Sequence, residues 1–282
     1  MPGLKEPLDE ARVANRTGRG HRFLEVRMGY PGGKNGSGVY QQIINLMPPH
    51  QVYIEPFLGG GAVLRMKRPA CSSIGIDINL EVISDHGISD GMVPELTLIW
   101  DDALYWLASH TGFVDAAGVM VYLDPPYLME TRSYQGKLYD YEFTVEQHLV
   151  LLDLILSWRN CNVMISGYYS DLYASKLAGW TTKSFKARTH TYTATEWLWF
   201  NYPTPVELHD YRWLGEGYRE RERIKKKKAR WVARLGRMDV LERQALLSVL
   251  VPGAPEMMGS AVAMPYLVLP PKKVVVPGDT TK

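Results

Sequence analysis

The sequence holds only two cysteines, Cys71 and Cys161, among 282 residues. Each lies within or beside an apolar run, so they supply neither a disulfide framework nor the paired spacing of a zinc site. The apolar runs are short, and none approaches the roughly 18 consecutive residues that a membrane-spanning helix requires. Residues 1–20 lack the apolar core of a secretory signal. We therefore expect a soluble protein of the reducing cytoplasm, with no membrane partner and no metal.

Net charge is also small, but it is unevenly placed. The whole chain carries +2, yet residues 211–243 contain twelve Lys or Arg against five Asp or Glu. The centre of this region is the run Lys225, Lys226, Lys227 and Lys228. On a helix these cations could neutralise the phosphates of a nucleic acid. A solvated helical face is the alternative, and for charge runs in general it is the commoner outcome.

Short runs of β-branched and aromatic residues alternate with longer helical patterns. This alternation predicts an α/β fold, with a mostly parallel sheet that has helices on both faces. The expected strands are 52–57, 72–79, 96–100, 119–124, 162–166, 182–188 and 196–202. The expected helices lie near 38–47, 61–67, 80–88, 103–109, 145–158 and 170–177. Thr144 and Gln147 have the spacing of a capping box at the start of the helix over 145–158.

The chain divides into four segments by composition. We expect a flexible N-terminal segment at 1–26 and one α/β domain over 27–210. A basic helical extension is expected over 211–250. Prolines interrupt the tail over 251–282 every few residues, which favours an extended or disordered segment.

The most informative motif is Asp124-Pro125-Pro126-Tyr127, which follows the apolar run 118–123. A carboxylate and the Pro125 carbonyl can accept the two N–H bonds of an exocyclic amine, which frees the nitrogen lone pair for attack. Prolines fix φ near −65° and carry no N–H, so these carbonyls keep a fixed direction. Tyr127 could stack on the base that carries the amine. The motif favours N-methylation of a heteroaromatic amine over the alternative of an ordinary Pro-rich turn.

Strand ends earlier in the chain suggest a cofactor pocket. The segment from Glu55 to Gly61, with Phe57 and Gly59, joins the first strand to a helix, and its glycines allow a tight turn near a ligand. Its spacing is not the Gly-x-Gly-x-x-Gly fingerprint of dinucleotide binding. Asp77 ends the second strand, where an acid can accept ribose hydroxyls or cap the next helix. Asp102, after the third strand, could reach an adenine amine or serve as an N-cap.

A further Gly-rich turn, Tyr30-Pro31-Gly32-Gly33-Lys34, precedes these motifs. Taken in order with the Glu55–Gly61 turn, Asp77, the Asp124–Tyr127 motif and the strand 196–202, it resembles the Dam-type, alpha-group DNA N6-adenine methyltransferases. The resemblance covers roughly residues 28–203. It implies a seven-stranded class I methyltransferase fold, S-adenosylmethionine as cofactor and double-stranded DNA as partner. It places Tyr30, Lys34, Glu55, Phe57, Gly59, Gly61, Asp77, Asp102 and Asp124 at the cofactor, and Asp124, Pro125, Pro126 and Tyr127 at the reaction.

One departure from the family concerns DNA recognition. Dam-type enzymes usually insert a recognition domain before Asp-Pro-Pro-Tyr, whereas only residues 80–123 are available here. Sequence recognition must then come from elsewhere: the loop 128–143, the hairpin near 190–195 or the basic helix. Tyrosines between cations in that loop suit stacking and phosphate contact around a flipped base, with packing of a lid loop as the alternative. The candidate contacts in the loop are Arg132, Tyr134, Lys137, Tyr139 and Tyr141.

These patterns predict a site-specific DNA adenine N6-methyltransferase that transfers the methyl group directly to the flipped base. Two alternatives remain: the same chemistry on RNA adenine or cytosine N4, and a catalytically silent nucleic-acid-binding protein of the same fold. Cytosine C5 methylation is disfavoured because it needs a thiolate nucleophile, and neither Cys71 nor Cys161 follows a proline at a strand edge. The target sequence and the oligomeric state are not predicted.

Overall fold

The computed structural model describes residues 33–36, 38–85, 93, 95–132, 136, 139–188 and 193–250. The predicted N-terminal segment 1–26, the tail 251–282, Tyr30, Tyr134 and Lys137 lie outside these residues.

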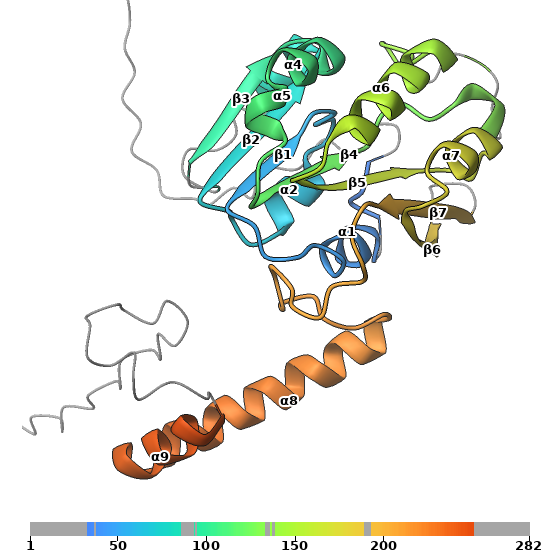
Figure 1. Ribbon diagram of the computed structural model, residues 1–282. Coiled ribbons are helices and arrows are strands. Elements are labelled where there is room, and N and C mark those ends of the chain that lie inside the picture. The colour runs from blue at the N-terminus through green and yellow to red at the C-terminus, as the bar shows by residue number, and fades with distance from the viewer. Residues whose placement is uncertain are drawn as a thin grey trace, which may run out of the picture.

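A single seven-stranded sheet forms the centre of the domain, in the order β3-β2-β1-β4-β5-β7-β6 (Figure 1). Only β7 is reversed, and it pairs antiparallel with both β5 and β6. The predicted α/β fold is therefore confirmed. The strands are β1 (Val52–Glu55), β2 (Ser72–Asp77), β3 (Leu96–Trp100), β4 (Val119–Leu123), β5 (Asn162–Gly167), β6 (Thr181–Arg188) and β7 (Thr193–Phe200).

Helices cover both faces of the sheet and create two apolar cores. One core packs α4 (Ala103–Ser109), α5 (Thr111–Val114), α6 (Val145–Ser157) and α7 (Asp171–Lys176) on the sheet. The other packs α1 (Val39–Ile44), α2 (Ala62–Met66) and α3 (Leu80–Asp85) on the opposite face. Along β4, Val119, Val121 and Leu123 enter the first core, and Met120 and Tyr122 enter the second. Burial on both faces explains why this strand is a continuous apolar run.

Local signals in the sequence fix the helix that follows the Asp124–Tyr127 motif. The Thr144 hydroxyl accepts a hydrogen bond from the Gln147 amide at 3.3 Å, and the Gln147 side chain accepts one from the Thr144 amide at 2.9 Å. The predicted capping box is confirmed, and α6 begins at Val145, directly after Thr144. A short 3-10 helix, η1 (Met129–Thr131), lies between the motif and this box.

Beyond β7 the chain leaves the sheet and forms α8 (Tyr218–Arg237) and α9 (Val240–Leu250). Both helices extend away from the α/β domain, below α1 in the view of Figure 1. In the described ranges, no helix combines the length and the apolar character that crossing a membrane would need.

Candidate active site

A pocket opens at the carboxyl ends of β1, β2 and β4. The strand order turns between β1 and β4, and open α/β sheets bind ligands at such a switch point. The structure brings together at this pocket every described residue that was predicted to bind the cofactor. These residues are Lys34, Glu55, Phe57, Gly59, Gly61, Asp77, Asp102 and Asp124, and Pro125 and Pro126 join them.

The glycine turn after β1 forms one wall of the pocket. Gly59 and Gly61 have φ of 44° and 56°, in the left-handed region that favours glycine. The Asp77 carboxylate holds this turn, because it accepts hydrogen bonds from the backbone N–H of Gly59 and of Asn79, both at 2.9 Å. Asp77 therefore shapes the turn as well as lining the pocket.

Asp102 occupies the position that the sequence left open between two roles. Its carboxylate accepts a hydrogen bond from the Tyr105 amide at 2.9 Å, so it is the N-cap of α4. It also lines the pocket. The two predicted roles are compatible, since a cap uses only part of the hydrogen-bonding capacity of a carboxylate.

Asp124 sits directly after β4 and is held by two donors. The Lys34 ammonium lies 2.8 Å from Asp124 Oδ1, and the Ser166 hydroxyl donates to the same oxygen at 2.9 Å. Within the described residues, no hydrogen bond or ion pair reaches Oδ2. The Asp124 side chain keeps 18% of its surface exposed, whereas Lys34 keeps 6%. One carboxylate oxygen is thus held by the protein, and the residue lines the pocket.

Glu196 on β7 is a member of the site that the sequence reasoning missed. Its Oε1 lies 3.0 Å from the Lys34 ammonium and accepts the Tyr127 hydroxyl at 2.6 Å. Burial raises the pKa of Glu196, and the positive charge of Lys34 works against this rise. The one available signal was an acid directly before the apolar residues Trp197–Phe200 in the predicted strand 196–202, because an unpaired buried carboxylate is costly.

The two carboxylates also govern the charge of Lys34. Burial on its own would lower the lysine pKa, but the negative charges of Asp124 and Glu196 outweigh burial and raise it above the ordinary value. Lys34 is therefore a fixed cation at the centre of the cluster. It also donates a short hydrogen bond to the Tyr127 hydroxyl.

Tyr127 points into the protein rather than into the pocket. Its ring is 6% exposed and lies edge-on to Tyr168, with centroids 4.7 Å apart. Its hydroxyl bonds to Lys34 and Glu196, and burial raises its pKa well above the ordinary value. This orientation does not offer the ring for the stacking predicted from the sequence. Instead, the aromatic side chains that line the pocket are Phe57, Tyr139, Tyr141 and Phe143.

Glu55 gives the pocket a weakly acidic group behind Asp124. It is buried at the end of β1 and accepts the Tyr53 hydroxyl at 2.7 Å. Burial raises the pKa of Glu55 to about 8, so the carboxyl group is protonated in most molecules at neutral pH. Glu55 therefore adds little negative charge near Asp124 at neutral pH.

The loop after the Asp124–Tyr127 motif is held to the domain by Arg132. Its guanidinium donates to the Tyr127 carbonyl at 2.7 Å and pairs with Glu142 at 2.7 Å. It also lies over the Tyr139 ring, 4.9 Å from the centroid. Because Arg132 is buried and engaged inside the protein, its position speaks against the predicted contact with nucleic acid. What the arginine does in this structure is hold Tyr139 and Glu142 at the pocket.

The remaining predicted nucleic-acid contacts lie far along the chain on α8. Lys225, Lys226, Lys227 and Lys228 are all exposed there. Lys225 lies 3.8 Å from Glu222, and Lys228 donates to the Tyr211 carbonyl at 3.0 Å. Among the described residues, no group of His, Cys, Asp or Glu side chains has the arrangement of a metal site.

Comparison with known proteins gives only distant structural likenesses. No protein-family model and no curated protein matches the sequence. An rRNA methylase from Streptococcus thermophilus is similar in structure, with 12% identity, a TM-score of 0.37 and coverage of 57% of this chain and 92% of that one. The N-methyltransferase NodS from Bradyrhizobium japonicum has 9% identity, a TM-score of 0.43 and coverage of 58% and 94%. Magnesium protoporphyrin IX methyltransferase from Synechocystis, with bound SAM, has 13% identity, a TM-score of 0.38 and coverage of 58% and 80%. The strand order of this chain, with its single reversed strand, is that of the class I methyltransferase fold.

Proposed function

We propose that this protein is an S-adenosylmethionine-dependent methyltransferase that acts on the N6 amine of adenine in DNA. The observation that carries the proposal is Asp124, whose Oδ1 is fixed by Lys34 and Ser166 while its Oδ2 is left for a ligand in the same pocket as the Gly59–Gly61 turn.

The wall formed by β1, β2 and β3 suits the cofactor. Asp77 at the end of β2 would hold the ribose, and Asp102 at the start of α4 would lie near the adenine. Phe57 and Phe143, which meet edge to face with centroids 5.4 Å apart, supply apolar surface for the same ring. The cofactor would bring an electrophilic methyl group on a sulfonium centre.

The wall formed by β4 suits the substrate amine. A conjugated amine is a poor nucleophile, and its lone pair becomes available when its N–H bonds are directed to acceptors. Asp124 Oδ2 would accept one N–H and the Pro125 carbonyl the other. The reaction needs no covalent intermediate with the protein, because a held amine and a held methyl donor can react in line.

Lys34 and Glu196 prepare Asp124 for this role. The ammonium keeps the Asp124 carboxylate in one orientation, and Glu196 keeps the ammonium in place. Preorganised charges of this kind account for much of the rate enhancement in many enzymes. The arrangement is therefore a positioning device for the acceptor rather than a proton relay.

A base that carries the amine would have to leave the helical stack to reach the pocket. Tyr139 and Tyr141 line the pocket in the loop held by Arg132, and Tyr141 is half-exposed. We assign the stacking of the flipped base to these rings, in place of Tyr127.

The proposal is tested by mass spectrometry of nucleosides from duplex DNA incubated with the protein and S-adenosylmethionine. We expect N6-methyladenine with the natural protein and at least about a hundredfold less with Asp124→Ala. Asp153→Asn is the matched control, because this acid is exposed and pairs only with Lys176 in the described structure. N4-methylcytosine, or modification of RNA alone, would move the substrate to another class. Full turnover by Asp124→Ala would overturn the mechanism.

A further inference from the structure

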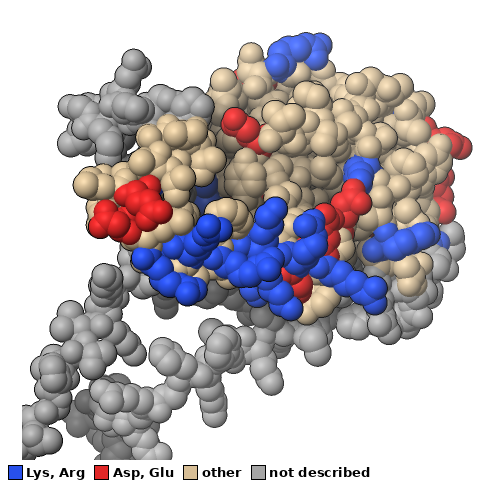
Figure 2. Space-filling view, turned by 90° about the horizontal axis from the view of Figure 1, so that it is seen from below, with Lys and Arg blue, Asp and Glu red and all other residues tan. Residues whose placement is uncertain are grey.

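The helix α8 has a distinct distribution of charge around its axis. It contains ten Lys or Arg against two Glu. At 3.6 residues per turn, Arg219, Arg223, Lys226, Arg230 and Arg237 fall within about 60° of arc, over about 27 Å of helix length. We call these five residues the basic stripe. Figure 2 shows Lys and Arg side chains gathered in a band on the face seen from below.

The other side of α8 contacts the segment that leads into the helix. Arg221 approaches the Gly215 carbonyl at 3.4 Å, and Lys228 donates to the Tyr211 carbonyl at 3.0 Å. Ile224, on the same side of the helix, is half-buried. Because these contacts lie on the side away from the basic stripe, the stripe points to solvent. Lys226 and Arg230 are exposed, and no hydrogen bond or ion pair to either occurs in the described part of the chain.

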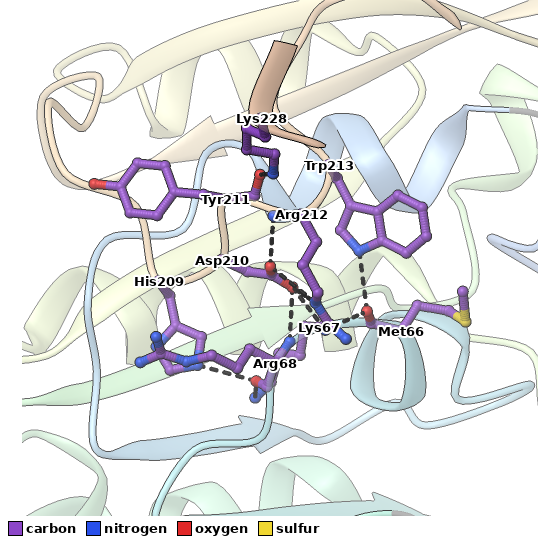
Figure 3. Close-up of polar contacts among 9 residues, drawn as sticks. All are labelled: Met66, Lys67, Arg68, His209, Asp210, Tyr211, Arg212, Trp213 and Lys228. Atoms are coloured by element: carbon purple, nitrogen blue, oxygen red, sulfur yellow. Dashed lines mark hydrogen bonds and ion pairs between the residues drawn. The ribbon is translucent and has the colours of Figure 1, made fainter. Parts of the chain in front are cut away.

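A network of polar contacts fixes the segment before α8 on the domain (Figure 3). Buried Asp210 accepts hydrogen bonds from the Arg68 amide and from the Arg212 guanidinium, both at 2.8 Å. Arg212 and Trp213 both donate to the Met66 carbonyl at 3.0 Å, at the end of α2. The stripe is therefore carried on a fixed support, so less conformational entropy is lost when it binds a partner.

We infer that the basic stripe binds the phosphate backbone of the duplex that carries the target base. This inference rests on the proposed function, which makes the substrate a duplex DNA. A row of cations with no acid in it matches a polyanion, and release of counterions from the phosphates supplies the binding free energy. Such contacts position the protein and carry no sequence information. Of the predicted run of lysines, Lys226 belongs to the stripe, whereas Lys225 and Lys228 lie on the other side of the helix.

An anionic membrane surface is the competing partner for a basic helix. An interfacial helix carries its cations on a polar face and inserts the opposite, apolar face into the lipid. In α8 the side opposite the stripe contacts Tyr211 and Gly215 through Lys228 and Arg221, and Ile224 and Leu235 on that side are half-buried, so the apolar side is already partly covered by the protein. Half-exposed Trp231 and Val232 lie outside the stripe. The arrangement favours phosphates in a nucleic acid.

The test compares two double variants of the full chain that remove the same charge from the same helix. Lys226→Gln with Arg230→Gln alters the stripe, and Lys225→Gln with Lys228→Gln is the matched control. Anisotropy of labelled mixed-sequence duplex DNA is measured between about 50 and 200 mM salt. For the stripe variant we expect affinity at least about tenfold lower, and a salt slope smaller by up to about 1.8, at about 0.9 per phosphate contact. The control should change little.

Three results would overturn the inference. Equal losses in both variants would show that only total charge matters, and no loss in either would make the stripe a solvated face. Binding to vesicles of anionic phospholipid that the stripe variant loses, with DNA binding unchanged, would assign the stripe to membranes. The proposed function is tested independently of DNA binding, by assaying methylation and by measuring cofactor binding with calorimetry. If the natural protein methylates no nucleic acid but the stripe variant selectively weakens duplex binding, the proposed function fails and the stripe stands.

Discussion

Replacing Lys34 by Met tests the charge cluster beneath the candidate active site. The change keeps most of the side-chain volume and removes the ammonium that lies 2.8 Å from Asp124 and 3.0 Å from Glu196. Breaking a buried ion pair by removing one partner costs about 3–5 kcal/mol, because the remaining charge loses its compensation. Asp124 is partly exposed and can recruit water, so Glu196 carries most of this cost. We expect a loss of about 3 kcal/mol at pH 8.

The loss should depend on pH in a defined direction. In the natural protein the raised pKa of Lys34 keeps the ammonium charged below the lysine's unfolded pKa of about 10.4, so Lys34 itself adds no pH dependence between about pH 5 and pH 8. In the variant, buried Glu196 has no cation, and its folded pKa rises further above the unfolded value of about 4.3. Ionisation of Glu196 then penalises the folded state as pH rises. The difference in unfolding free energy should therefore shrink as pH falls toward about 5.

Urea unfolding followed by tryptophan fluorescence measures this difference. Lys183→Met is the control, because Lys183 forms an exposed pair with Glu216 at 3.2 Å and such pairs contribute about 0.2–1 kcal/mol. Adding Glu196→Gln to Lys34→Met should recover most of the loss and most of its pH dependence, since both charges are then gone. A loss under about 1 kcal/mol, or one that is the same at every pH, would refute the idea that Lys34 neutralises a buried carboxylate.

Two further predictions concern the pocket walls. Asp77→Ala should weaken S-adenosylmethionine binding by about 1.5–3 kcal/mol in calorimetry, because a charged acceptor beside the glycine turn is lost; unchanged affinity in a folded variant would move the cofactor elsewhere. Glu55→Gln should raise stability relative to the natural protein as pH rises from about 4.5 to about 8, because the folded pKa of Glu55 is raised to about 8 and ionising it there is costly. Parallel stability curves for both proteins would contradict that shift.

The gathering of Glu55, Asp77 and Asp124 at one pocket could be predicted because it depends on strand ends. Glu55, Asp77 and Asp124 each lie at or directly after the end of a short apolar run, and parallel strands bring their carboxyl ends to one edge. The runs themselves were visible because β4 is buried on both faces and so has no polar positions. Local periodicity and one topological rule were enough to gather these residues.

Glu196 could not be placed in this way. It lies near the start of β7, and it meets the carboxyl ends of β4 and β5 only because β7 runs antiparallel and inserts between β5 and β6. Strand direction depends on tertiary pairing, which no window of sequence contains. The direction of Tyr127 was missed for the same reason: its hydroxyl turns inward to partners 93 and 69 residues away along the chain.

The cationic side chains show what the spacing of residues in the sequence can and cannot predict. Lys34, Arg132 and Lys226 are all cations in the sequence, yet the first two are buried beside carboxylates and the third is exposed. On α8, the helical period alone predicts that Lys226 and Arg230 share a side and that Lys228 lies on another. It cannot say which side meets solvent. That choice is made by Asp210 and the contacts around it, which seat the segment before α8 on the end of α2. The side of a basic helix that meets solvent is therefore set by contacts of the preceding segment, which the sequence of the basic run does not contain.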